Sequence, residues 1–222
     1  MNSPQPLNEF YQALFACSAD VAGSIGRRAI ERSYPVRATI VKQGDATDAT
    51  FLMVHGRAHA LTYGIEGQSV LLHEFLPGDF FGVVTQADIQ PEDADVVAIE
   101  ESRAAVFLAL DFLALVETHS CMGLAVSRAL LRQLRAAANR VLERSTLSAS
   151  GRVHAELLRL ARLNKAWTIH PAPVLSKLAV RVNSTRETVS RTISALERRG
   201  IIRREKGALI VVAPRLLEEM IV

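Results

Sequence analysis

The stretch that decides the fold is LSKLAVRVNSTRETVSRTISALERRGIIRREKGALIVV, residues 175–212. Its first residues place leucine, alanine and valine at helical spacing, which predicts a short amphipathic helix. Asn183 then supplies a residue that tolerates the left-handed conformation of a tight turn. Ser184 and Glu187 have the spacing of a capping box, so we expect a second helix to begin at Thr185.

This second helix has a predicted end and is followed by a predicted hairpin. Gly200 is well placed to end the helix in the left-handed conformation. The runs Ile201–Arg204 and Ala208–Val212 flank a turn around Lys206 and Gly207, which is the pattern of a two-stranded hairpin. Helix, turn, helix and hairpin in this order predict a winged helix-turn-helix.

The second helix carries polar residues at the positions that meet base edges when a recognition helix enters the DNA major groove. Arginine donates two hydrogen bonds to guanine, and glutamate accepts one from cytosine, with about 1–3 kcal/mol of discrimination for each good pair. A surface ion pair would explain such residues alone, but not their combination with the turn and the hairpin. The candidate base-reading residues are Arg186, Glu187, Ser190 and Arg191.

Charge is unevenly distributed along the 222 residues, although the net charge is only +3. Residues 1–120 hold 7 Lys and Arg against 16 Asp and Glu, whereas residues 151–222 hold 14 against 6. A basic C-terminal region is the electrostatic pattern of a nucleic-acid-binding domain. A solvated basic face without such a partner would give the same charge.

The N-terminal half predicts a helical start and a β-rich body. Residues 8–33 place apolar residues at roughly helical spacing, with Gly23 and Gly26 as expected breaks. Between residues 34 and 110, short β-rich runs alternate with turn signals, which predicts an antiparallel roll or barrel. The expected strands are Ala38–Val41, Thr50–Val54, Arg57–Tyr63, Ser69–Phe75, Val96–Ile99 and Ala104–Ala109.

Residues from Asp111 to about Arg144 predict one long helix, because they include no proline and a single glycine. Apolar residues recur on it at alternating spacings of three and four, the pattern of a packing seam. Such a seam packs either against the core of the same chain or against a second, parallel copy. The seam residues are Leu124, Leu131, Leu134, Ala138 and Val141.

The composition, 49% hydrophobic and 22% charged, is typical of a globular protein. The most apolar stretch, Ala104–Val116, is too short to cross a bilayer, and the N-terminus lacks the pattern of a secretion signal. We therefore expect a cytoplasmic protein with no membrane partner. Cys17 and Cys121 form no CxxC motif and have apolar neighbours, so we expect inert thiols, no metal site and no cofactor.

Residues Thr185–Arg191, TRETVSR, with a wing after Gly200, resemble the DNA-reading motif of the CRP/FNR family of bacterial transcription regulators. The motifs Phe51–Gly56, Leu76–Gly82 and Ser150–Val153 follow in the family's order. The resemblance implies an α+β fold with an N-terminal antiparallel β-roll (cyclic-nucleotide-binding-like, a double-stranded β-helix), a long dimerisation helix and a C-terminal winged helix-turn-helix. The implied boundaries are 1–110, 111–145 and 146–222.

The resemblance also implies partners. It implies a homodimer that binds double-stranded DNA, with half-sites about 34 Å apart, and that contacts RNA polymerase. Half-sites of the TGTGA or TTGAT type are expected, and Arg186 favours the first. Basic and polar residues off the base edges are expected to bind phosphates, which set affinity rather than sequence choice. These residues are Arg152, Lys177, Arg181, Thr185, Arg198, Arg203 and Lys206.

The effector site departs from the family's pattern. The cyclic-nucleotide site of the family has a glutamate for the ribose, soon after a Gly-Asp-Phe-x-Gly turn, and an Arg-Ser pair for the phosphate. The turn here ends at Gly82, the glutamate position is Val83, and the Arg-Ser positions are Asp93 and Ala94. No arginine lies between residues 57 and 103 that could replace the missing one.

Two further features of the effector site disfavour a cyclic nucleotide. Carboxylates at Asp88, Glu92, Asp93 and Asp95 would repel a phosphate, by about 4 kcal/mol for two unit charges about 4 Å apart at an effective dielectric of about 20. On the long helix, Ala137 and Ala138 stand where hydroxyl side chains would contact the base. We therefore expect no useful affinity for cyclic AMP.

Several alternatives stay open for control and function. One alternative is a constitutively active protein whose activity is set by its abundance. A second is control by another small ligand, such as a cyclic dinucleotide, bound in the roll. A third is regulation by a partner protein. A ligand-binding module acting through protein contacts alone would leave the basic C-terminal region unexplained. An enzyme is disfavoured, because His55, His59 and His73 lack a spaced carboxylate pattern and no nucleophile–base motif appears, so we expect no catalytic residue.

Overall fold

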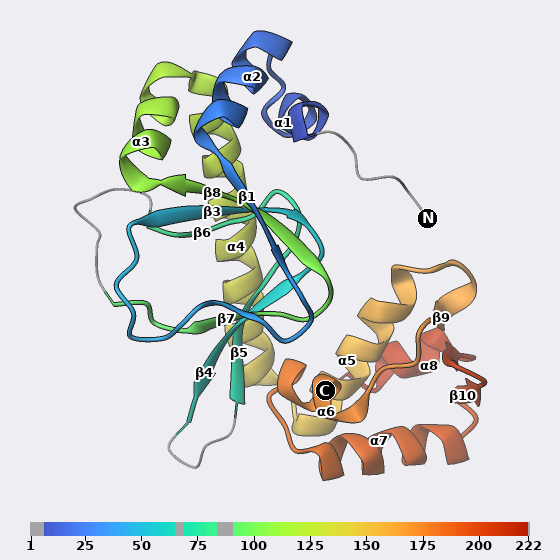
Figure 1. Cartoon of the computed structure of the whole chain (residues 1–222). Helices are drawn as coiled ribbons and strands as arrows, with labels where there is room; N and C mark the ends of the chain where they lie inside the picture. Colours follow the sequence, from blue (N-terminus) through green and yellow to red (C-terminus); the bar gives the residue numbers. More distant parts are fainter. Residues whose placement is uncertain (1–6, 65–68, 84–90, 222) are drawn as a thin grey trace. The chain divides into compact units, whose positions relative to one another are not determined.

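The structure is a computed structural model that describes residues 7–64, 69–83 and 91–221 (Figure 1). The chain divides into two compact units, Met1–Ala137 and Ala138–Val222, and the boundary falls inside helix α4 (Ser120–Thr146). Within the described ranges, no single helix combines the length and the hydropathy needed to cross a bilayer. The bent pair of α3 (Ala109–Thr118) and α4 does so on length and composition alone.

The N-terminal unit begins with two short helices, α1 (Leu7–Phe15) and α2 (Ala19–Arg28). Gly23 and Gly26 lie inside α2, so the breaks predicted at these glycines are wrong. A Cβ added at Gly26 would stand 3.1 Å from Oδ1 of Asn8 in α1. The glycine therefore permits close packing of two helices instead of ending one. The helical region also stops earlier than predicted, because strand β1 (Ile30–Tyr34) follows.

Eight strands of the described residues form two four-stranded antiparallel sheets, which together make the predicted roll. The first sheet has the order β1-β8-β3-β6 and the second the order β2-β7-β4-β5. All six predicted strands are present, and β1 and β6 are additional. The three residues of β6 were hidden within the turn signals around Pro77 and Gly78. The remaining bounds are β2 (Thr39–Val41), β3 (Ala49–His55), β4 (Ala58–Tyr63), β5 (Ser69–Phe75), β6 (Phe80–Gly82), β7 (Asp95–Ala98) and β8 (Ser102–Leu108).

Strand β3 separates two apolar cores, because successive side chains of a strand point to opposite faces. Phe51 and Met53 are buried in the core between the sheets. Leu52 and Val54 are buried in a second core, which α1, α2, α3 (Ala109–Thr118) and α4 share with the outer face of the first sheet. The roll is thus filled on the inside and covered by helices on one outside face (Figure 1).

The predicted long helix is two helices, α3 and α4, whose axes differ by 112°. His119 separates them with extended backbone (φ −122°, ψ 99°), and its N–H ends α3 by donating to the Leu115 carbonyl. No proline or glycine marks this break, so the sequence offered no local signal for it. The prediction of one helix from Asp111 is therefore wrong, although α4 alone has 27 residues.

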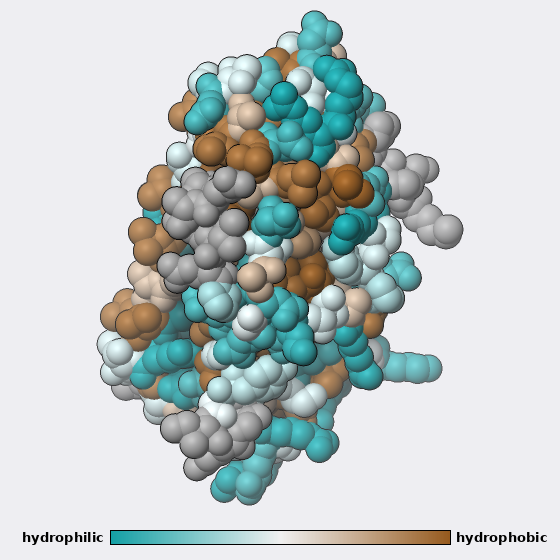
Figure 2. Space-filling view, turned by 60° about the vertical axis from the view of Figure 1, so that its left-hand side comes forward, coloured by the Kyte–Doolittle hydropathy of each residue, from teal (hydrophilic) through white to brown (hydrophobic). Residues whose placement is uncertain are grey.

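Helix α4 has one face packed on the roll and another face exposed. Met122, Ala125, Val126 and Ala129 are buried in the core of the N-terminal unit. The predicted seam lies on exposed surface, with Leu124 at 57%, Leu131 at 51%, Leu134 at 67% and Val141 at 63% exposure. Figure 2 shows, on one face of the molecule, apolar residues at the surface among polar ones. Packing within one chain therefore explains the buried face of α4 but not its seam.

The C-terminal unit is the predicted winged helix-turn-helix, extended by a third strand in the order β10-β11-β9. Its apolar core collects one side of each helix, including Val153 and Leu157 of the first helix after α4 and Val189, Ile193 and Leu196 of the third. The elements after α4 are α5 (Ala149–Arg162), a 3₁₀ turn η2 (Lys165–Trp167), β9 (Thr168–Ile169), α6 (Leu175–Arg181), α7 (Arg186–Arg198), β10 (Ile202–Glu205), β11 (Ala208–Val211) and α8 (Pro214–Glu219).

Two glycines of the roll provide a test of how tightly the turn between β3 and β4 is packed. Gly56 and Gly44 have similar left-handed φ angles of +78° and +86°. A Cβ added at Gly56 would stand 2.4 Å from the Glu101 carbonyl oxygen, whereas a Cβ added at Gly44 would meet nothing within 4 Å. We expect Gly44→Ala to cost about 1–2 kcal/mol of unfolding free energy and Gly56→Ala about 2–5 kcal/mol, because crowding adds to the left-handed strain. Urea titration of the two variants measures both values, and equal losses would contradict the packing.

Candidate nucleic-acid interface

Helix α7 begins one residue later than predicted. Its N-cap is Thr185, whose Oγ1 accepts a hydrogen bond of 3.1 Å from the Thr188 N–H, so Ser184 is not the capping residue. Thr185 lies outside the helix with extended backbone, as a capping residue does. The end of the helix is as predicted, since Gly200 has φ +69° and the Ile201 N–H donates to the Leu196 carbonyl.

The predicted base-reading residues all lie in the first two turns of α7, on the side away from the apolar core. Arg186, Glu187 and Arg191 are exposed, and Ser190 is half-buried. The Arg191 guanidinium lies 3.0 Å from Glu187 Oε1, and both side chains are more than 70% exposed. An ion pair this exposed adds little stability, so both groups are available to an incoming ligand.

The turn between α6 and α7 is fixed by an arginine of α5. Arg152 donates from Nε to the Val182 carbonyl (2.9 Å), from Nη2 to the Asn183 carbonyl (3.2 Å) and from Nη1 to the Leu147 carbonyl (3.0 Å). Asn183 has the predicted left-handed conformation, with φ +48°. Arg152 was predicted to bind a phosphate, but its donors instead hold the turn in place.

Arg181 also points to the protein rather than to solvent. Its Nε lies 2.8 Å from Glu156 Oε1, and the side chain is only 17% exposed. A guanidinium held this closely by a carboxylate is poorly placed to reach a phosphate. The structure therefore shows Arg152 and Arg181 bound to groups of the protein itself, and their phosphate contacts stay a prediction.

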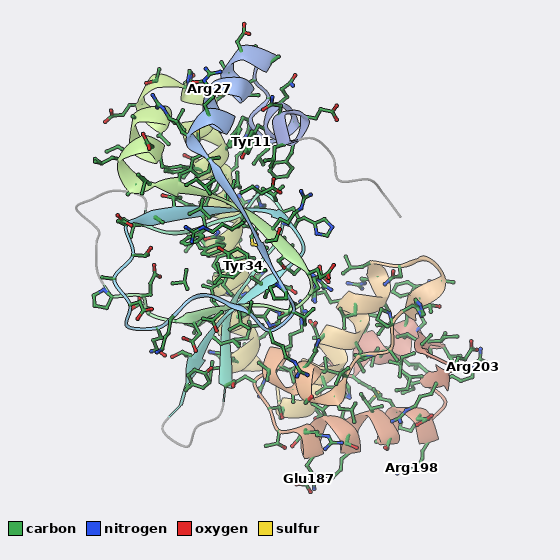
Figure 3. The ribbon with its side chains drawn as sticks, viewed as in Figure 1. Tyr11, Arg27, Tyr34, Glu187, Arg198 and Arg203 are labelled. Carbon is green, nitrogen blue, oxygen red and sulfur yellow. The ribbon has the colours of Figure 1, made fainter. Side chains whose placement is uncertain are left out.

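The other predicted phosphate contacts lie on exposed surface. Glu187 and Arg198 point away from α7, and Arg203 extends from the wing (Figure 3). Arg203 lies 3.0 Å from Glu205, and both side chains are at least half exposed. Arg204, which the sequence analysis did not select, is paired with Glu197 at 3.3 Å. The exposed predicted contacts are Lys177, Thr185, Arg198, Arg203 and Lys206.

The predicted effector site is apolar at Gly82, Val83 and Ala94. Gly82 has φ +83°, and a Cβ there would stand 2.4 Å from the Ala49 carbonyl oxygen. Val83 is buried, and its carbonyl accepts a hydrogen bond from the Thr50 hydroxyl. Ala94 is buried in the core between the sheets. This region therefore offers a close backbone approach and apolar side chains rather than donors for a ribose or a phosphate.

Aromatic rings fill the core between the sheets. Phe51 and Phe81 stack with centroids 5.0 Å apart and planes 2° from parallel, and Phe75 lies 4.6 Å from Phe81. These rings belong to the same buried cluster as Ala94. Ala94 and the three rings are thus parts of one buried apolar cluster.

The acidic segment beyond the roll turn carries closely spaced carboxylates. Burial raises the pKa of Glu92, and the neighbouring charge of Asp93 raises it further. Asp95 accepts hydrogen bonds from the Gln43 N–H (2.8 Å) and the Tyr63 hydroxyl (3.0 Å). Asp93 is exposed, and Asp88 lies outside the described residues. A phosphate placed here would meet negative charge.

Helix α4 holds the turn before β6 through two side chains. The Arg132 guanidinium lies 3.0 Å from Asp79 Oδ1 and 3.2 Å from the Gly78 carbonyl oxygen. Gln133 donates to the Phe80 carbonyl at 2.9 Å. Further along α4, Ala137 is half-buried and Ala138 is exposed, and neither has a hydroxyl. In the part of the chain that is described, no group of three or more His, Cys, Asp or Glu could hold a metal ion.

Two family models match separate parts of the chain. A model of the cyclic nucleotide-binding domain matches residues 31–119, and a model of the Crp-like helix-turn-helix domain matches residues 151–220. The chain is 31% identical over 191 residues to the Cyclic AMP receptor protein of Thermus thermophilus, which covers 85% of this chain and 87% of that protein. It is 26% identical over 188 residues to the cAMP-activated global transcriptional regulator CRP of Salmonella typhimurium, over 82% and 89% of the two chains.

A solved structure shares the fold at lower sequence identity. CooA from Carboxydothermus hydrogenoformans superposes with a TM-score of 0.78 over 100% of this chain and 98% of that one, at 17% identity. This likeness concerns the arrangement of the chain and carries no information on a ligand.

Proposed function

Because the chain belongs to the CRP/FNR family of DNA-binding transcription regulators, we propose that it acts as a homodimer that reads a palindrome of TGTGA-like half-sites. The observation that carries the proposal is the exposed face of α7, where two arginines and a glutamate lie within two turns of a capped helix start. In a major groove, this end of the helix meets the base edges first.

Each base-reading side chain has a role in the proposal. Arg186 and Arg191 donate to guanine O6 and N7, and Glu187 accepts from cytosine N4, which fits half-sites containing G·C pairs. Ser190 contacts either kind of base. Arg191 and Glu187 are both exposed and lie 3.0 Å apart, so they can reach the same stretch of DNA.

The exposed basic residues outside this face supply the phosphate contacts of the proposal. Lys177 lies on α6, Arg198 at the end of α7, and Arg203 and Lys206 on the wing. Such contacts are independent of sequence and weaken as salt rises. Thr185 adds a hydroxyl at the helix start.

The exposed seam of α4 supplies the dimer contact. Leu124, Leu131, Leu134 and Val141 are all more than half exposed, and burying them against a second copy removes apolar surface from water. Ala138 between them allows the two helices to approach closely. A parallel pair of helices places two copies of α7 to read two symmetric half-sites.

We further propose that cyclic AMP is not the effector. The related proteins named above are cyclic-AMP-dependent by name, but in this chain Val83, Asp93 and Ala94 stand at the ribose and phosphate positions, and phenylalanine rings fill the core beside Ala94. Activity is then constitutive, or it depends on another small ligand or cyclic dinucleotide in the roll. Because the chain belongs to this family, the proposal also includes contact with RNA polymerase.

Titration calorimetry with cyclic AMP tests the effector proposal. We expect no binding at micromolar nucleotide, because the site lacks an arginine for the phosphate and is flanked by carboxylates. The same preparation must bind its DNA site, which shows that it is folded. Micromolar affinity for cyclic AMP would contradict the proposal.

Selection of bound duplexes from a random pool, with and without cyclic nucleotides, tests the proposed function as a whole. We expect a two-fold symmetric site whose half-sites contain G·C pairs and lie about one helical turn apart, and the same site under both conditions. A selected site without symmetry, or without G·C pairs in both half-sites, would contradict it.

A further inference from the structure

An open cavity lies between α5 and α7 in the C-terminal unit. Its volume is about 300 Å³, which is at the lower end of the range for small-molecule sites. Helix α5 supplies Ser150 and His154 to its wall, α7 supplies most of the other residues, and Met220 at the end of α8 completes it. All of these residues belong to one compact unit, so the cavity is formed within that unit alone.

Two arginines on one side of α7 line the cavity. Arg191, Ala195 and Arg199 follow one another at intervals of four residues, so they share a face of the helix. Both arginines are exposed, and Ala195 has only a methyl group to place between them. Arg191 is paired with Glu187, which is outside the cavity wall. Among the described residues no Asp or Glu lines the cavity, so its wall carries positive charge.

The rest of the wall is apolar or already hydrogen-bonded to the protein. Leu196 is 1% exposed, and Met220 packs against the same apolar core. His154 is 6% exposed, and its Nδ1 donates to the Met220 carbonyl oxygen at 3.0 Å, because a carbonyl only accepts. The Thr192 hydroxyl donates to the Thr188 carbonyl at 2.9 Å. These contacts fix the wall, so the cavity is preformed.

We propose that this cavity is a binding site for a small aromatic carboxylate. Guanidinium groups bind carboxylates through paired hydrogen bonds and stack on aromatic faces. The thioether of a methionine also makes favourable contacts with aromatic rings. The carboxylate of the ligand binds Arg199 and Arg191, and its ring lies against the apolar part of the wall at Leu196 and Met220. The site does not depend on DNA binding.

Titration calorimetry of the full chain without DNA tests the site, with naphthoate as the probe. We expect saturable binding to one site per chain. Naphthalenemethanol, which has the same rings but no charge, should bind at least about tenfold more weakly, because hydrogen bonds to a charged group are lost. Absence of saturable naphthoate binding at millimolar concentration, or equal affinity for the two compounds, would overturn the proposal.

Three variants locate the bound probe. Arg199→Ala removes an exposed guanidinium and should lower the affinity for naphthoate about tenfold while hardly changing that for naphthalenemethanol. Ala195→Leu fills part of the cavity and should weaken the binding of both compounds. Arg215→Ala, the matched control, removes an exposed arginine of α8 outside the wall and should change neither affinity.

Thermal unfolding shows whether each variant is folded. Naphthoate affinity that is the same for Arg199→Ala as for Arg215→Ala would place the probe elsewhere and overturn the proposal. The comparison of the two compounds on the unsubstituted chain stays decisive even if a variant folds poorly.

Arg191 also belongs to the proposed base-reading face of α7. A carboxylate bound to Arg191 competes with guanine for the same guanidinium, a consequence that rests on the proposed function. We expect naphthoate, but not naphthalenemethanol, to lower the affinity for the palindrome in fluorescence anisotropy at constant ionic strength. Naphthoate binding with unchanged DNA affinity would contradict this shared use of Arg191. A chain that binds naphthoate but no duplex would contradict the proposed function and support the cavity site.

Discussion

Replacement of Arg191 by alanine is expected to weaken binding to the specific palindrome by about 2–6 kcal/mol while hardly changing binding to random duplex. Loss of a bidentate arginine–guanine contact costs about 1–3 kcal/mol, and a homodimer loses it in both half-sites. The fold should tolerate the change, because Arg191 is 71% exposed and its partner Glu187 is 75% exposed. Fluorescence anisotropy with both duplexes at one fixed salt concentration measures the effect.

Two variants calibrate the Arg191 result. Arg186→Ala removes the other base-reading guanidinium and should relax specificity at a different base pair. Lys206→Ala removes an exposed wing charge proposed to bind phosphate. It should weaken binding to all DNA sequences about equally and slightly lower the dependence of affinity on salt concentration. Equal losses on palindrome and random duplex for Arg191→Ala would count against its assignment as a base-reading residue.

A glutamate in place of Leu134 is expected to separate the dimer and to lower affinity for the palindrome by at least about a hundredfold. Leu134 is 67% exposed on α4, so the substitution costs the single chain little. In a dimer seam, the two new carboxylates would be buried against apolar surface without partners, which costs about 3 kcal/mol or more, and each 1.4 kcal/mol is a tenfold change. Sedimentation velocity at micromolar protein measures the dissociation.

Arg135→Glu provides the matched control for Leu134→Glu. It lies on the same exposed turn of α4 but about 100° further around the helix, and it changes the charge by more. We expect this variant to remain dimeric. Dimers of equal strength for both variants would show that the seam of α4 is not the contact between two copies.

The winged helix-turn-helix could be predicted from sequence because its signals are local. Asn183 and Gly200 adopt the left-handed conformations that their positions indicated, and the apolar stripe of α7 faces the core as its spacing required. The cap was misplaced by one residue, because Ser184 and Thr185 are both good capping residues and the spacing to Glu187 favoured the wrong one. The structure uses Thr185 and leaves Glu187 to pair with Arg191.

Features that depend on contacts distant in sequence could not be predicted. Nothing local marks the break at His119 or distinguishes a glycine that ends a helix from one that lets two helices touch, as Gly26 does. Arg152 looked like a phosphate contact because its positive charge is visible in the sequence, while the three carbonyls it holds are not.

The description of the effector site needs both local sequence signals and contacts between residues that are distant in sequence. The missing arginine and glutamate are visible in the sequence, and the acidic residues after the roll turn indicate repulsion of an anion. The stacked Phe51 and Phe81 belong to the same buried apolar cluster as Ala94, which only the structure shows.

The most direct test of the central claim is the stoichiometry of the protein on a duplex at low ionic strength, measured by sedimentation in the absence of any nucleotide. We expect two chains on one palindromic duplex carrying two TGTGA half-sites about 34 Å apart. A chain that stays monomeric and binds neither this duplex nor any other at low salt would contradict the account.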